Sequence, residues 1–220
     1  RRTLMTEGPL RTEVKGDGVV LLTLDRPDRR NALNAELRGL LADTLARLAT
    51  DESCRVVVLA GNGPTFCAGF DLDEIRVAAS LETLFAEADA YHHAVHSFPK
   101  PIIAAIHGPA VAGGMDLALM CDLRIAGVEA TFGQPQVKAG IPAAFDLVAS
   151  VVAEPVARDI CLTGRLFGAT EALSMGMVNH LAEGDDLIEA ALALATEIAS
   201  SPASAAAKAQ FLASQPQLFD

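Results

Sequence analysis

Two stretches of the chain decide how its fold is interpreted: TFCAGFDL at residues 65–72 and HGPAVAGGMD at residues 107–116. Each follows a short apolar run, the first ending at Gly61 and the second at Ile106. Their small residues let a ligand approach main-chain N–H groups closely, and the second stretch opens a helix, whose start carries a partial positive charge. Two such N–H groups on one oxygen would form an oxyanion hole for enolate or tetrahedral charge. Taken alone, each loop is more simply an ordinary turn of an α/β fold.

Outside these loops, short apolar runs alternate with segments of helical periodicity. The sequence predicts strands over 18–25, 55–61, 102–107 and 123–126, and helices over 34–48, 81–98, 115–121, 144–152, 169–175 and 187–200. Asn34 is the predicted N-cap of the first helix. Strands that are apolar on both faces and alternate with helices indicate a mainly parallel sheet covered on both sides. We therefore expect one α/β domain followed by a smaller helical segment.

Composition narrows the class of protein. Of the 220 residues, 51% are hydrophobic, which is enough for a core and excludes wholesale disorder. The net charge of −11 argues against a general nucleic-acid binder, because phosphate contacts need a clustered basic surface. The most apolar window, 102–120, is interrupted by Gly, Pro and polar residues, so we predict no membrane span. Four cysteines without CxxC spacing and no secretory signal predict free thiols and a cytoplasmic location. Residues 1–4, which precede Met5, are set aside as a short leader.

Three local patterns are weighed and set aside. His92 and His96 have the spacing of two metal ligands on a helix, but there is no obvious third ligand, so we predict no metal. The stretch GNGP at 61–64 begins like a dinucleotide fingerprint, but Phe66 stands where the last glycine would be. Cys67 is better interpreted as a small buried apolar residue than as a nucleophile.

In this order, the motifs of the chain resemble those of the crotonase (enoyl-CoA hydratase/isomerase) superfamily. The matching residues are Leu24-Asp25-Arg26-Pro27, Asn31-Ala32-Leu33-Asn34, the stretch 66–72, the stretch 100–108, Ala112-Gly113-Gly114, Leu117-Ala118, Cys121-Asp122, Phe132-Gly133-Gln134-Pro135, Leu162-Thr163-Gly164, Ala172 and Gly176-Met177-Val178. The resemblance implies an α/β spiral of ββα turns over residues 12–185. It also implies a helical C-terminal segment over 186–220, which we expect to be incomplete, and assembly as a homotrimer or a dimer of trimers.

The resemblance also implies a substrate and a site. The substrate would be an acyl-CoA thioester, with no cofactor beyond the coenzyme A that it carries. Ala68 and Gly113 match the positions whose N–H groups bind the thioester oxygen. The implied substrate-binding residues are Ala68, Gly69, Phe70, Asp71, Gly113, Gly114 and Arg29, with Arg26 and Arg30 in the same basic region.

The chain departs from the family pattern at the acid/base positions. Asp116 and Gln136 stand where hydratases of this family have two glutamates. Asp116 can titrate and is the expected acid/base, whereas Gln136 can orient a water or carbonyl but cannot exchange a proton at neutral pH. We expect an enzyme of the hydratase/isomerase type that stabilises a thioester enolate. Two alternatives stay open: a non-catalytic acyl-CoA binder, and another enolate reaction, such as hydrolysis, that uses Asp146.

Overall fold

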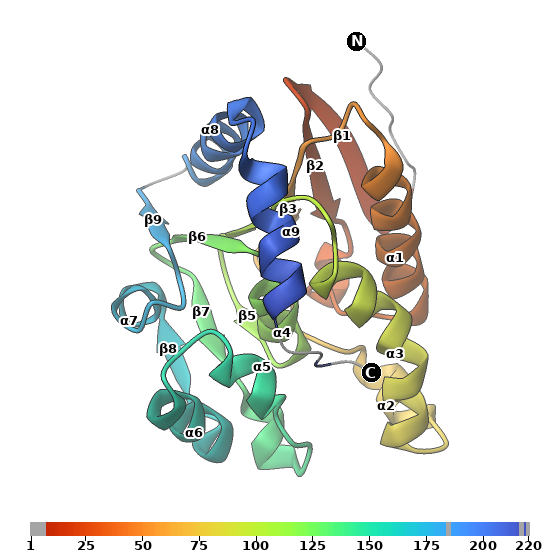
Figure 1. The fold of residues 1–220 in the computed structure, drawn as a ribbon. Helices are drawn as coiled ribbons and strands as arrows, with labels where there is room; N and C mark the ends of the chain where they lie inside the picture. Colours follow the sequence, from red (N-terminus) through yellow and green to blue (C-terminus); the bar gives the residue numbers. More distant parts are fainter. Residues whose placement is uncertain (1–7, 184–185, 216–217, 219–220) are drawn as a thin grey trace.

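The structure is a computed structural model, and it describes residues 8–183, 186–215 and 218. The strands of these residues form two sheets (Figure 1). The larger sheet has the order β1-β2-β3-β4-β6-β9, and the smaller has the order β5-β7-β8. The bounds are β1 (Leu10–Gly16), β2 (Val19–Leu24), β3 (Val56–Gly61), β4 (Ile102–Ile106), β5 (Ala110–Val111), β6 (Leu123–Gly127), β7 (Thr131–Gly133), β8 (Leu166–Gly168) and β9 (His180–Ala182).

The direction of the strands places the two loops that opened the sequence analysis. From β2 to β9 the large sheet is parallel, and β1 pairs antiparallel with β2. Because β3 and β4 are adjacent and parallel, the chain segments that follow them leave the same edge of the sheet. A parallel bridge between Cys67 and Ala110 continues this pairing beyond the strands. The two loops are therefore neighbours in space.

Helices cover both faces of the large sheet. Their bounds are α1 (Ala35–Thr50), α2 (Leu72–Val77), α3 (Leu81–His96), α4 (Gly113–Met120), α5 (Phe145–Ala149), α6 (Glu154–Thr163), α7 (Ala169–Ser174), α8 (Leu187–Ser200) and α9 (Ser204–Ser214), with 3-10 turns at Pro27–Arg29 and Pro135–Ala139. Figure 1 shows α1 and α3 on one side of the sheet and α8 away from them. None of the helices among the described residues has both the length and the apolar character needed to cross a bilayer.

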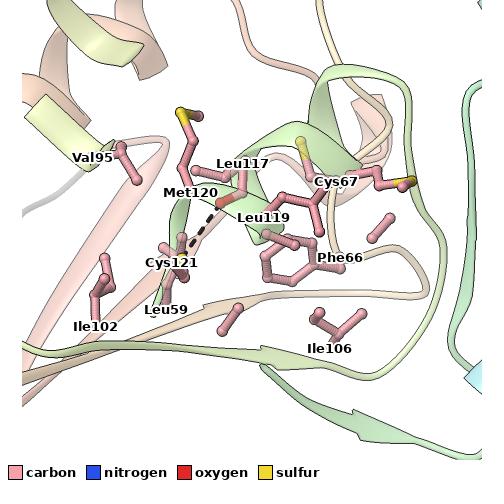
Figure 2. Close-up of a cluster of buried hydrophobic side chains, with 14 of the residues drawn as sticks. Leu59, Phe66, Cys67, Val95, Ile102, Ile106, Leu117, Leu119, Met120 and Cys121 are labelled. Atoms are coloured by element: carbon pink, nitrogen blue, oxygen red, sulfur yellow. Dashed lines mark hydrogen bonds between the residues drawn. The ribbon is translucent and has the colours of Figure 1, made fainter. Parts of the chain in front are cut away.

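Successive side chains of a strand point to opposite faces of the large sheet, so the buried side chains form one cluster on each face. In β3, Val57 and Leu59 belong to the cluster under α1, α3 and α4, whereas Val56 and Val58 belong to the cluster under α8. Figure 2 shows the first cluster around α4, where the Cys121 thiol donates to the carbonyl oxygen of Leu117 at 3.4 Å. Burying these apolar side chains is the main stabilising term of the fold.

The predicted α/β class with a mainly parallel, doubly covered sheet is confirmed. The N-cap at Asn34 is also confirmed, because its side chain accepts from the N–H of Leu37. Several predicted helix boundaries are wrong. α4 begins two residues earlier than expected, α1 ends two residues later and α3 ends two residues earlier. The helix expected over 144–152 extends only over Phe145–Ala149. The division at 185/186 stays a prediction. The segment set aside at residues 1–4 lies outside the described residues.

Candidate active site

A cavity of about 550 Å³ opens where the two loops meet. Its walls come from the loop at 68–70, α2, α3, the start of α4, the 3-10 turn after β7 and the start of α5. The lining residues are Ala68, Phe70, Leu72, Ile75, Phe85, Asp89, His92, Val111, Ala112, Gly113, Asp116, Pro135, Gln136, Ala139, Ile141, Pro142, Ala143, Ala144 and Leu147. Five residues expected from the sequence are brought together here: Ala68, Phe70, Gly113, Asp116 and Gln136.

Not all main-chain N–H groups of the two loops are available to bind a ligand oxygen. The N–H of Ala68 donates to the carbonyl oxygen of Arg30 at 3.1 Å, so it cannot also hold a ligand oxygen. The expected role of Ala68 as a donor is therefore corrected. The N–H groups of Phe70 and Gly113 have no acceptor among the described residues. These two groups are available donors where the two loops meet.

Close packing brings Phe70 and Gly113 together. A Cβ on Gly113 would lie 3.0 Å from the Phe70 ring, and a Cβ on Gly69 would lie 2.9 Å from the Gly113 nitrogen. Gly69 itself has φ +91°, a left-handed conformation that favours glycine. Ala112, the N-cap of α4, has φ +51°, which is uncommon for a residue with a side chain. The turn thus directs the first N–H of α4 towards the loop.

Asn31 holds the first loop in place. Its side-chain amide donates to the carbonyl oxygens of Asn62, Thr65 and Phe66 at 2.9, 2.7 and 3.1 Å, and its Oδ1 accepts from the N–H of Arg26. Asn31 is fully buried. Sequence reasoning placed Asn31 among the family motifs but gave it no role. A buried amide that satisfies several loop carbonyls is a positioning residue for the cavity wall.

Gly114, expected to bind substrate, packs closely against the first loop. It does not line the cavity, and a Cβ there would lie 2.0 Å from the carbonyl oxygen of Cys67. Gly69 likewise faces Gly113 rather than the cavity. Both glycines permit the close approach of the two loops, and their expected contact with substrate stays a prediction.

Asp71 and Arg29 also lie outside the cavity lining. Asp71 is the N-cap of α2 and forms ion pairs with Arg26 at 3.0 Å and Arg29 at 3.1 Å. These pairs and its bond to the N–H of Asp73 lower the pKa of Asp71 against the opposing effect of burial. Arg29 also pairs with Asp73, which together with Asp71 raises its pKa. Both residues thus anchor α2, and their expected contact with substrate stays a prediction.

The rest of α2 is attached in the same way. This helix buries none of its residues. Glu74 accepts from the guanidinium of Arg38 at 2.8 Å and from the N–H of Ala35 at 2.6 Å. Leu72 and Ile75 of α2 contribute apolar side chains to the cavity wall. One wall of the cavity is therefore held mainly by charged groups.

Asp116 lies in the first turn of α4, half-buried, with access to the cavity. Burial raises its pKa to about 7, because apolar surroundings disfavour the charged form; a hydrogen bond from Gln134 acts in the opposite direction. Asp116 can therefore exist in both protonation states near neutral pH. This is the property required of a group that both takes and returns a proton.

Two hydrogen bonds in series connect Asp116 to the side-chain amides of Gln134 and Gln136. The buried Gln134 donates to Oδ1 of Asp116 at 2.8 Å, and its Oε1 accepts from the amide of Gln136 at 2.6 Å. An ionised Asp116 only accepts, which fixes the orientation of both amides. The Oε1 of Gln136 is then left buried without a donor among the described residues. The site thus presents a carboxylate and a separate neutral acceptor.

We expect Gln134→Leu to raise the pKa of Asp116 further, because the substitution removes the one hydrogen bond that favours the ionised form. The measurement is the midpoint of the pH–rate profile, which should move to higher pH. Gln210→Leu, an exposed substitution on α9, is the matched control and should leave the midpoint in place. An unchanged midpoint in Gln134→Leu would contradict the role given to Gln134.

The remaining candidates lie elsewhere. Asp146 is exposed in the first turn of α5 and is not among the residues that line the cavity, so the hydrolytic alternative that relies on it stays a prediction. His92 lines the cavity, whereas His96 lines a different one. Among the described residues, no group of three or more His, Cys, Asp or Glu side chains could hold a metal. Sequence reasoning missed Gln134 as the partner of Asp116, and also missed the cavity positions of Asp89 and His92.

The mainly parallel sheet, the apolar cavity, the N–H donors of Phe70 and Gly113 and the carboxyl group of Asp116 agree with the crotonase superfamily that the sequence motifs resemble. A family model described as enoyl-CoA hydratase/isomerase matches residues 14–216, and the chain belongs to this family. A relative from Thermus thermophilus, provisionally named an enoyl-CoA hydratase, is 41% identical over 85% of this chain and 77% of its own length. A 4-chlorobenzoyl coenzyme A dehalogenase of Arthrobacter is 36% identical over 84% of this chain and 71% of its own. The crystal structure of an enoyl-CoA hydratase of Mycobacterium smegmatis matches with TM-score 0.90 and 34% identity, covering 96% of this chain and 86% of that one.

Proposed function

We propose that this chain is an acyl-CoA enzyme that moves the double bond of an enoyl thioester, with Asp116 as its single acid/base. The observation that carries the proposal is the position of Asp116. It lies in the same first turn of α4 as the free N–H of Gly113, with a pKa of about 7. Relatives at similar identity are named for different reactions, so the local chemistry of this site decides the reaction.

The proposed reaction needs one group that takes and returns a proton and one site that binds the thioester oxygen. The N–H groups of Phe70 and Gly113 hold the thioester oxygen. Ionised Asp116 takes a proton from C2 of a 3-enoyl thioester, and the electron pair spreads onto the thioester oxygen as a dienolate. Protonated Asp116 then returns the proton to C4, which leaves a 2-enoyl thioester. The atoms balance without water and without a cofactor beyond the coenzyme A of the substrate.

Hydration is a second candidate, supported by the unpaired Oε1 of Gln136. This oxygen could accept from a water while Asp116 removes its other proton. The water oxygen would then bond to C3, and Asp116 would return the proton to C2. Mass analysis separates the two reactions, because hydration yields a product heavier by one water and isomerisation does not.

The proposal predicts that kcat/KM rises with pH and levels off above a midpoint near 7, because Asp116 must be ionised to accept a proton. The assay follows a 3-enoyl-CoA over a range of about pH 5.5–9. A rate that is independent of pH through this midpoint would contradict Asp116 as the base.

A non-catalytic acyl-CoA binder remains the competing function. It predicts saturable binding of acyl-CoA with neither isomerisation nor hydration across a panel of enoyl chain lengths. Turnover of any of these thioesters would exclude it. Assembly as a homotrimer or a dimer of trimers stays a prediction, and exposed Leu162, Leu166 and Leu173 on the α6–α7 region support an interface there.

A further inference from the structure

A buried guanidinium, that of Arg38, lies behind the loop that carries the Phe70 donor. Arg38 belongs to α1 and is only 3% exposed. Its Nη1 donates to the carbonyl oxygen of Leu33 at 2.7 Å and to Oε2 of Glu74 at 2.8 Å. Its Nε is buried without an acceptor among the described residues. Burying an arginine with an unsatisfied N–H costs free energy, so stability alone does not account for this residue.

The bond from Arg38 to Leu33 restrains the main chain around Phe70. The N–H of Leu33 donates to the carbonyl oxygen of Gly69 at 2.8 Å, and the carbonyl oxygen of Leu33 accepts from the N–H of Asp71 at 3.4 Å. These two bonds form a parallel bridge between Leu33 and Phe70. Since successive N–H groups of an extended segment point to opposite sides, the N–H of Phe70 points away from Leu33. Arg38 thus holds the carbonyl against which this direction is set.

The same guanidinium restrains the ring of Phe70. Its central carbon lies 5.1 Å from the ring centroid, within cation–π range. The ring also packs against Gly113, since a Cβ there would lie 3.0 Å from it. Arg38 is not among the described residues that line the cavity, so it acts on a ligand through Phe70 rather than by contact.

A simpler role for Arg38 would be to anchor α2, because it forms an ion pair with Glu74 of that helix. The contacts allow the two roles to be separated. Removing the charge of Glu74 weakens the attachment of α2 but leaves the contacts of Arg38 with Leu33 and Phe70 in place. Removing the guanidinium eliminates all three contacts.

We propose that Arg38 is a positioning residue that directs the N–H of Phe70 towards the thioester oxygen, by holding the carbonyl of Leu33 and the ring of Phe70 at once. This inference rests on the proposed function, because it takes that N–H to hold the oxygen of an acyl-CoA thioester. It deepens the function by adding a residue of α1 that acts on the reaction without touching the substrate.

The test compares Arg38→Met with two controls. Arg38→Met removes every polar contact of the guanidinium and keeps a long apolar side chain. Glu74→Gln tests the anchoring of α2, and Arg158→Met makes the same substitution at an exposed ion pair of α6. Each protein is assayed for kcat and KM with an enoyl-CoA. The infrared band of the thioester carbonyl is also measured in the complex with a saturated acyl-CoA that is isotopically labelled at its carbonyl carbon.

In Arg38→Met, kcat should fall about tenfold while KM stays within about twofold of wild type, because a misdirected donor weakens transition-state stabilisation more than binding. N–H donors lower the frequency of the bound carbonyl band, and in Arg38→Met this shift should be about half of the wild-type shift. Glu74→Gln and Arg158→Met should match wild type in kcat and band position. Arg38→Lys keeps the charge without the planar group over the ring, so it should lie between wild type and Arg38→Met.

A wild-type kcat and band position in Arg38→Met would overturn the inference, as would equal effects of Glu74→Gln and Arg38→Met. If Arg38→Met does not fold, Arg38→Lys decides, and wild-type values in that variant overturn the inference. A shifted carbonyl band in the wild-type complex without turnover of any enoyl-CoA would defeat the proposed function alone. An unshifted band in that complex would defeat both, because neither N–H would then hold the thioester oxygen.

Discussion

Asp116→Asn should lower turnover of an enoyl-CoA by about 10²–10⁴-fold while acyl-CoA binding is retained. Asparagine has nearly the same shape, and its oxygen can still accept the bond that Gln134 donates at 2.8 Å. It cannot, however, take and return a proton. The measurements are kcat by absorbance of the conjugated thioester and Kd by calorimetry.

The same substitution should stabilise the protein, and the size of this effect should depend on pH. In the folded state the pKa of Asp116 is raised from 3.8 to about 7, so the native state binds the proton more tightly than the unfolded chain. The contribution of Asp116 to stability therefore falls as pH rises from about 4 to about 7. The asparagine side chain of the variant has no charge to bury, so the variant should gain up to about 4 kcal/mol at about pH 8.

Thermal unfolding of both proteins measures this gain. The difference in Tm should be largest above pH 7 and should become smallest below about pH 4, where the carboxyl of Asp116 is mostly protonated in both folded and unfolded states. Asp146→Asn, at an exposed position of α5, is the matched control and should leave kcat near the wild-type value. Full activity in Asp116→Asn would remove Asp116 from the mechanism.

The second large effect is expected at Gly114. A Cβ at this position would lie 2.0 Å from the carbonyl oxygen of Cys67 and 2.6 Å from its carbonyl carbon. Because these are backbone atoms of the neighbouring loop, the strain cannot be relieved by rotating a side chain. Gly114→Ala should therefore lower the free energy of unfolding by about 3 kcal/mol or more. It should also push Phe70 away from Gly113 and reduce activity in the protein that still folds.

Gly39→Ala is the matched control, since it also replaces a helical glycine. A Cβ at Gly39 meets nothing within 4 Å, and the residue is exposed on α1. This variant should gain about 0.5–1 kcal/mol, because alanine loses less backbone entropy on folding. Urea unfolding of both variants gives the comparison. Equal stability of Gly114→Ala and wild type would show that the loops can separate without cost.

Periodicity was sufficient to predict most of the large sheet and the helices that cover it. The all-apolar runs of β2, β3 and β4 are buried on both faces, as their composition predicts. β1 was missed because it alternates polar and apolar residues at the edge of the sheet. The signal that could have found it is Asp17-Gly18, both with positive φ, between two extended runs.

The site was predicted less completely, for a physical reason. Small residues indicate where a chain can approach closely, but not which N–H groups remain unused. The bond from Ala68 to the carbonyl of Arg30 joins segments far apart in sequence, and no local pattern reveals it. The same holds for Gln134, whose contact with Asp116 depends on the return of β7 beside β5.

Because ion pairs attach α2, this helix and the large sheet are stabilised by different kinds of interaction. The sheet and its covering helices are held by burial, which salt does not weaken, whereas α2 depends on charges that dissolved ions screen. Its opening free energy is therefore low and adjustable, as for segments that exchange amide hydrogens through local unfolding. We therefore expect added salt to loosen the wall that α2 contributes to the cavity more than it loosens the sheet beneath it.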